Sequence, residues 1–133
     1  MRVFRFDKIV RSGIPASIEA SGGTAEKRSV ADEEGFKLLL DKAQEEIAEA
    51  GRASLATRAE ELADARAAFE AAITLSGVTL EEIDAAAKIK SEAYGGFIPP
   101  VYLGLVALQD DDPWADKLAA NPERYEEVPE AKE

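Results

Sequence analysis

The sequence predicts an all-α protein, and three observations support this fold class. Residues 32–50 and 57–76 each repeat apolar side chains with the period of a helix. Alanine supplies much of the 46% hydrophobic fraction, which favours closely packed helices over a sheet. Glycine follows both segments, at Gly51 and Gly77, where it stops a helix. A chain of 133 residues is long enough for one domain with an ordinary core.

The N-terminal residues predict a short element ahead of the long helices. Residues 1–13 mix apolar and basic side chains, a pattern that fits a short strand or an extended arm. Gly13 marks a turn, and Pro15 suits the first turn of a short helix. That helix is expected to end at Gly22 and Gly23, because two consecutive glycines are a strong stop.

Three longer helices are predicted between residues 32 and 96. The first begins at Asp32 as N-cap, the second is capped by Thr57 with Glu60 in a capping box, and the third begins at Thr79. Gly95 and Gly96 stop the third helix. The predicted buried stripes are Phe36, Leu39, Leu40, Ala43, Ile47 and Ala50 in the first, and Leu62, Ala65, Phe69, Ala72 and Ile73 in the second.

The C-terminal part of the chain lacks the pattern of a long helix. Pro99 and Pro100 disfavour a helix, and residues 101–106 predict a strand or a short buried run. A short helix is expected at residues 114–120. We therefore divide the chain into a helical domain, residues 1–108, and a partly ordered acidic tail, residues 109–133.

Composition excludes several classes of function. The chain has no cysteine and no histidine, so thiolate and imidazole chemistry are excluded and carboxylates, or a metal-activated water, remain for acid–base work. A net charge of −11 makes it a poor binder of nucleic acid, and a free nucleotide would be repelled unless a divalent metal were bound. The sequence contains no P-loop motif. Charges interrupt the N-terminus and no apolar run spans a bilayer, so a cytoplasmic protein without membrane association is expected.

Two acidic motifs flank the break between the first two long helices. Glu45, Glu46 and Glu49 form an E-E-x-x-E unit, and Glu61 and Asp64 form an E-x-x-D unit. Helix positions three apart share a face, so an antiparallel hairpin would bring the two units together. Converging carboxylates need a cation, and their oxygens suit Mg²⁺ or Mn²⁺. The alternative interpretation is an ordinary solvated acidic surface.

The motifs and their order resemble those of a known family over residues 6–105. E-E-x-x-E followed by E-x-x-D is similar to the signature of MazG-like all-α nucleoside triphosphate pyrophosphohydrolases. The K-I-V-R of residues 8–11 with Ile14 and Pro15 resembles the K-L-V-R-D-K-I-P opening of the phosphoribosyl-ATP pyrophosphohydrolase-like branch. Residues 95–97, Gly-Gly-Phe, resemble its closing R-G-G-F.

This resemblance implies a fold, an activity and a set of site residues. The fold would be an antiparallel helical bundle completed by oligomerisation, as a homodimer or tetramer. The activity would be Mg²⁺-dependent, house-cleaning hydrolysis of a nucleotide at its α-phosphate, giving a monophosphate and pyrophosphate, with phosphoribosyl-ATP as one possible substrate. Glu45 would be a catalytic base, a group behind the ligands or a surface residue. The implied metal ligands are Glu46, Glu49, Glu61 and Asp64, and the candidate phosphate-binding residues are Lys8, Arg11, Lys42, Lys88 and Lys90.

The chain also departs from the family pattern. Ser12 and Gly13 replace an Asp-Lys pair, and Tyr94 stands in place of the arginine before Gly-Gly-Phe. These changes leave a second hypothesis open, a catalytically silent helical dimerisation or regulatory module with the same fold.

Overall fold

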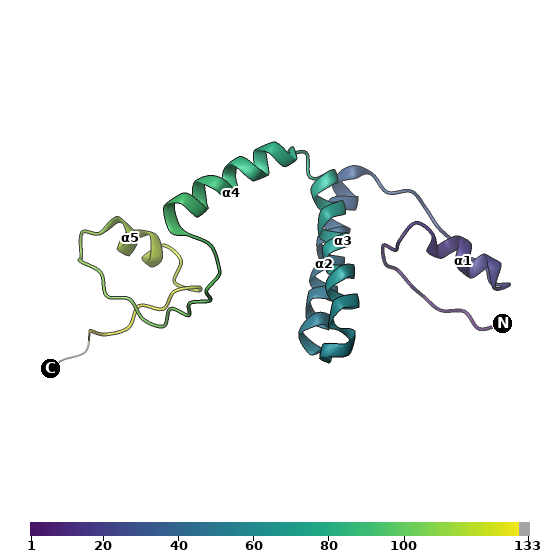
Figure 1. The fold of residues 1–133 in the computed structure, drawn as a ribbon, viewed down its shortest axis with the longest axis horizontal. Coiled ribbons are helices and arrows are strands. Elements are labelled where there is room, and N and C mark those ends of the chain that lie inside the picture. The colour runs from purple at the N-terminus through teal and green to yellow at the C-terminus, as the bar shows by residue number, and fades with distance from the viewer. Residues whose placement is uncertain (131–133) are drawn as a thin grey trace. The chain divides into compact units, whose positions relative to one another are not determined.

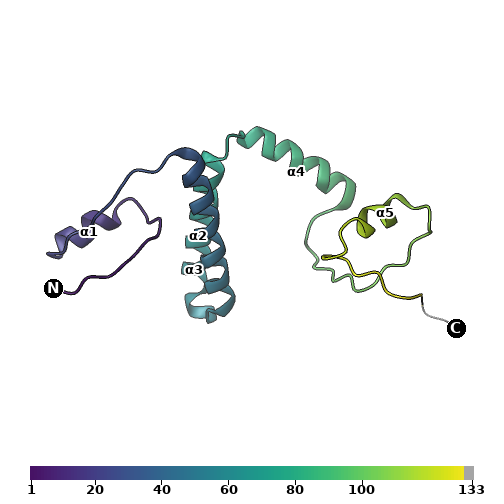
Figure 2. The same cartoon turned by 180° about the vertical axis from the view of Figure 1, so that it is seen from behind.

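A helical hairpin forms the centre of the computed structural model, which describes residues 1–130. Helix α2, Asp32–Arg52, packs antiparallel against α3, Leu55–Leu75 (Figures 1 and 2). Only Ala53 and Ser54 separate the two helices, and both have extended backbone conformations. So short a connection forces the second helix back along the first, as in other αα-hairpins.

Three further helices complete the described chain. They are α1, Ile14–Ala20, α4, Leu80–Tyr94, and α5, Pro113–Ala119. No strand occurs among residues 1–130, so the all-α prediction is confirmed. The N-terminal residues before α1 form an arm without regular structure and not a strand. None of the helices formed by residues 1–130 is both long and apolar enough to cross a bilayer.

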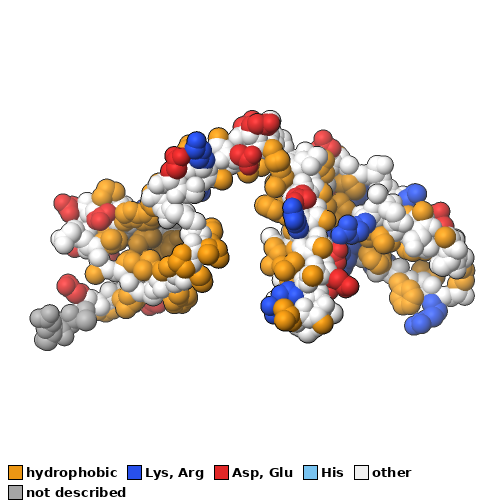
Figure 3. Space-filling view, viewed as in Figure 1, with side chains coloured by type: hydrophobic (Ala, Val, Ile, Leu, Met, Phe, Trp, Pro, Cys, Tyr) orange, Lys and Arg blue, Asp and Glu red, His pale blue; other side chains and the backbone are white. Residues whose placement is uncertain are grey.

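The chain divides into two compact units, Met1–Tyr94 and a second that begins at Gly95. In the second unit, the expectation of a strand or a buried run at residues 101–106 is wrong, because this segment has no regular structure and is exposed. Phe97 and Tyr102 are both 96% exposed, and apolar side chains gather on the chain after α4 (Figure 3).

Short polar segments set the ends of the helices. The backbone N–H of Glu82 donates to the Thr79 hydroxyl over 3.1 Å, which confirms Thr79 as the cap of α4. The Asp112 carboxylate accepts from the N–H of Trp114 over 2.8 Å at the start of α5. The predicted cap at Thr57 is wrong. Because the hairpin turn is so short, α3 begins at Leu55, and Thr57 lies inside its first turn.

Alanine forms the core of the hairpin. The buried apolar residues of the described chain are Ala43, Ala50, Ala65, Ala68 and Ala72. Small side chains let the two helix backbones approach closely, in line with the sequence prediction. The predicted burial of the large stripe residues is wrong, because the single seam of a two-helix hairpin cannot enclose them. Some are only half-buried, namely Phe36, Leu39, Leu40 and Ile73, and three others are exposed. Ile47, Leu62 and Phe69 are 58%, 52% and 51% exposed.

Candidate functional site

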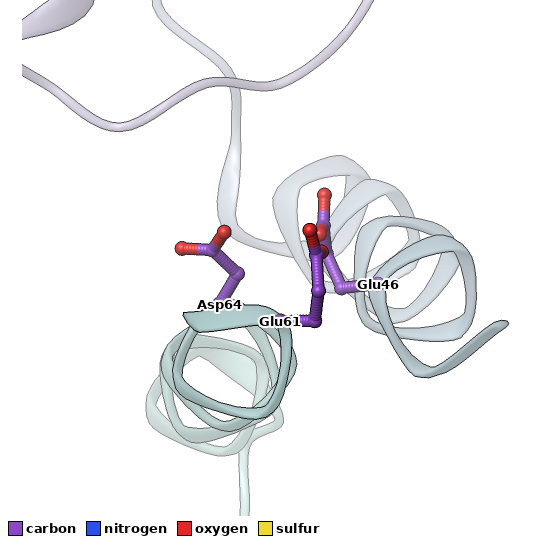
Figure 4. A group of neighbouring side chains, drawn as sticks. All are labelled: Glu46, Glu61 and Asp64. Carbon is purple, nitrogen blue, oxygen red and sulfur yellow. The ribbon is translucent and has the colours of Figure 1, made fainter. Parts of the chain in front are cut away.

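Three carboxylates converge on one side of the hairpin. Glu46 comes from α2, and Glu61 and Asp64 come from α3 (Figure 4). One oxygen of each lies within 4.8 Å of the others, and all three residues are half-buried. Among the residues that the structure describes, this is the group of acidic side chains that could hold a metal ion.

The local sequence explains why these side chains meet. Glu61 and Asp64 are three residues apart on α3 and therefore project from the same side of that helix. The two-residue turn returns α3 antiparallel to α2, which brings Glu46 opposite Glu61. Figure 4 shows the Glu61 carboxylate next to that of Glu46, with the Asp64 carboxylate on the other side of Glu61.

The chemistry of this donor set fits a hard divalent cation. All three ligands are carboxylate oxygens, which suit Mg²⁺ and Mn²⁺. Adjacent octahedral ligands about 2.1 Å from Mg²⁺ lie about 3.0 Å apart, and opposed ligands lie about 4.2 Å apart. The three oxygens, all within 4.8 Å of one another, would move closer together around a bound ion.

Crowding of negative charge perturbs Glu61. Burial, hydrogen bonding with Glu46 and the charges of Glu46, Glu49 and Asp64 all raise the pKa of Glu61 above its usual value of 4.5. The ionised form of Glu61 is therefore disfavoured in the folded chain without a cation. A metal ion at the cluster would reverse this effect, because it favours the ionised carboxylate.

We expect Glu61→Gln to raise the midpoint of thermal unfolding at pH 7 in the absence of metal. The pKa of Glu61 is higher in the folded chain than in the unfolded chain, so its contribution to stability is lost as pH rises through the folded pKa. Glutamine carries no charge and avoids this loss. The difference from wild type should vanish at pH 3, where Glu61 is protonated in both states. The control variant Glu60→Gln should leave the midpoint of thermal unfolding unchanged. A lower midpoint for Glu61→Gln than for wild type at pH 7 would contradict the destabilising effect of the ionised Glu61.

Two cations from the N-terminal arm lie on the hairpin. The Lys8 Nζ donates to Glu45 Oε1 over 2.7 Å, and the Arg11 Nη2 donates to Asp64 Oδ1 over 2.7 Å. The hydrogen bond and charge of Glu45 raise the pKa of Lys8, and the same hydrogen bond lowers the pKa of Glu45. The Lys8 ammonium thus contacts α2, and the Arg11 guanidinium contacts α3, next to the acidic cluster.

Lys42 supplies a third cation from α2 itself. Its Nζ lies 3.3 Å from Glu46 Oε1, one helical turn away, and the Glu46 side chain is only 13% exposed. Of these three cations, Arg11 contacts Asp64 of the cluster and Lys42 contacts Glu46 of the cluster.

Other sequence-predicted residues lie outside this three-carboxylate group. Glu49 accepts from Arg52 Nη2 over 2.7 Å, although its charge still contributes to the raised pKa of Glu61. Lys88 lies on α4, 3.9 Å from Glu92, and Lys90 is exposed on the same helix. No contact between these lysines and the cluster is found within residues 1–130.

No local sequence pattern predicts the two ion pairs between the N-terminal arm and the hairpin. Lys8 and Glu45 are 37 residues apart, and Arg11 and Asp64 are 53 apart, so no local spacing indicates which charges meet. The Lys42–Glu46 pair does have such a signal, since i and i+4 are neighbours on a helix. No protein-family model, curated protein or solved structure matches the chain.

Proposed function

We propose that this protein is a Mg²⁺-dependent nucleotide pyrophosphohydrolase that cleaves its substrate at the α-phosphate. The observation that carries the proposal is the convergence of Glu46, Glu61 and Asp64 within 4.8 Å, between two antiparallel helices. The order of the sequence motifs supports the same activity. The products would be a nucleoside monophosphate and pyrophosphate, with phosphoribosyl-ATP and non-standard triphosphates as candidate substrates.

The cluster residues would hold the metal, with Glu49 as a fourth ligand once its carboxylate leaves Arg52. Mg²⁺, or Mn²⁺ in its place, supplies charge neutralisation for the phosphates when it is bound. Because phosphoryl transfer depends mainly on positioning and neutralisation, the protein needs no covalent nucleophile. This suits a chain without cysteine or histidine.

The paired cations give the phosphates their protein contacts. Lys8, Arg11 and Lys42 each bind a carboxylate of the site in the described chain. A phosphate carries more charge and more acceptor oxygens than a carboxylate, so these side chains would transfer to the phosphates as substrate arrives. Lys88 and Lys90 are further candidates on α4.

Glu45 would accept the proton of the attacking water. Its pKa is lowered while Lys8 donates to it, which makes it a weak base in that state. Transfer of Lys8 to a phosphate would remove this donor and strengthen Glu45 as a base. Water oxygen then bonds to the α-phosphorus, the bond from that phosphorus to the bridging oxygen breaks, and pyrophosphate leaves with the electron pair.

We further propose that the protein is a homodimer or tetramer. Ile47 and Leu62 directly follow Glu46 and Glu61, so they project about 100° around each helix from the acidic side. Both are more than half exposed, as is Phe69 on the same stripe of α3. A second copy of the hairpin would bury these side chains and complete a four-helix bundle.

One observation favours the catalytically silent module as a second candidate. Arg11 and Lys42 already neutralise two of the three cluster carboxylates in the described chain, as purely structural ion pairs would. In that case the cluster takes up no metal and the hairpin serves association alone.

Pyrophosphate release tests the proposal directly. Purified protein is incubated with a panel of ribo-, deoxyribo- and modified nucleoside triphosphates and phosphoribosyl-ATP, in Mg²⁺, in Mn²⁺ and in excess EDTA. We expect release from at least one nucleotide with metal and none with EDTA. No release from any nucleotide in either metal would overturn the enzyme assignment in favour of the silent module.

A further inference from the structure

We propose that a pocket beside the acidic cluster binds the pentose of the nucleotide, and that Asp41 accepts hydrogen bonds from the sugar hydroxyls. This inference rests on the proposed function, which supplies the nucleotide. The pocket lies between the N-terminal arm and α2 and has a volume of about 210 Å³. Pockets for whole ligands usually occupy about 300–1,000 Å³, so this one fits a single group of a larger ligand.

The walls of the pocket match a sugar better than a nucleobase. Ile9 and Leu38, both half-buried, supply an aliphatic surface, and the remaining lining side chains are charged. No aromatic or amide side chain lines it within residues 1–130. Bases are commonly held by stacking and by amide hydrogen bonds, whereas a pentose presents a carbon face and a row of hydroxyls.

The pocket adjoins the proposed phosphate site through Lys42. This lysine lines the pocket, and its Nζ lies 3.3 Å from Glu46 Oε1 in the cluster. In a nucleotide, only O5′ and C5′ separate the α-phosphorus from the pentose ring. A substrate with its α-phosphate at the cluster therefore brings its pentose to the neighbourhood of Lys42.

Asp41 is the unengaged acceptor of this pocket. Of the other lining carboxylates, Glu45 accepts from Lys8 and is the proposed base, and the Asp7 Oδ2 lies 3.8 Å from Arg5 Nη1. Among residues 1–130, no hydrogen bond or ion pair is formed by the Asp41 carboxylate. An ionised carboxylate offers two oxygens that can accept from the adjacent 2′- and 3′-hydroxyls of a ribose together. Asp41 would thus select ribonucleotides over 2′-deoxyribonucleotides.

The test compares binding of AMP and dAMP in the presence of Mg²⁺, measured by NMR titration. The two ligands share base and phosphate and differ only in the 2′-hydroxyl. We expect wild-type protein to prefer AMP by about tenfold, because a hydrogen bond to a charged acceptor is lost with dAMP. Asp41→Asn should reduce this preference to near unity. The Asp84→Asn control on α4 should keep it.

The outcomes separate this inference from the proposed function. Equal affinity of wild type for AMP and dAMP, absence of binding, or an unchanged preference in Asp41→Asn would each overturn the pentose site. Pyrophosphate release with no pentose preference would leave the enzyme assignment standing without it. A ribose preference lost in Asp41→Asn, without pyrophosphate release from any nucleotide, would support the pocket and contradict the hydrolase.

Discussion

The Glu46→Gln variant should lose Mg²⁺-dependent pyrophosphate release by about a hundredfold or more. Loss of a single group that stabilises transition-state charge usually costs about 10²–10³ in rate. Glu46 is the cluster member contributed by α2, and its side chain is only 13% exposed. Glutamine has nearly the same shape as glutamate but carries no charge. Its amide oxygen therefore binds Mg²⁺ less strongly than a carboxylate does.

The matched control is Glu60→Gln. Glu60 is an exposed neighbour of Glu61 on α3 and belongs to no metal-binding group among the described residues. It undergoes the same chemical change without altering the cluster, and it should keep wild-type activity on the nucleotide that wild type cleaves fastest. Circular dichroism verifies that both variants keep their helices. Full activity of Glu46→Gln would contradict a role for the cluster in catalysis.

The Leu62→Glu variant should convert the protein into monomers. Leu62 is 52% exposed on α3, where an isolated chain would tolerate glutamate with an effect within about 0.5 kcal/mol. At a buried interface between hairpins, the same carboxylate would be taken out of water without a partner, which costs several kcal/mol. Light scattering coupled to size exclusion measures the mass of the assembly.

Leu80→Glu provides the matched control for this prediction. Leu80 is 53% exposed at the start of α4, so the substitution and the exposure are the same but the helix is different. The control should keep the mass of the wild-type assembly. A wild-type protein that is monomeric at micromolar concentration, or a Leu62→Glu variant of unchanged mass, would contradict association through the hairpin.

The sequence predicts the helices well because their signals are local. Apolar periodicity and Gly77 place α2 and α3 close to their observed bounds, although Gly51 lies inside α2, which continues to Arg52. Antiparallel return across a short break, combined with the spacing of Glu61 and Asp64, is sufficient to predict that these carboxylates approach Glu46. These parts of the fold depend on neighbours in sequence.

The remaining features depend on packing or on distant residues. Periodicity marks Ile47 and Leu62 as apolar but cannot tell that the seam of one hairpin is too narrow to cover them. Glu49 satisfies the motif, yet in the described structure it pairs with Arg52, three residues away. The approach of Arg11 to Asp64 spans 53 residues, and no spacing rule predicts it.

Calorimetric titration of Mg²⁺ tests the central claim most directly. Wild type is compared with the double variant Glu46→Gln, Glu61→Gln, each with a non-hydrolysable nucleoside triphosphate present. We expect saturable Mg²⁺ uptake by wild type above that of the nucleotide alone, and loss of this uptake in the double variant. No uptake by wild type, or equal uptake by both proteins, would contradict a metal site in the hairpin.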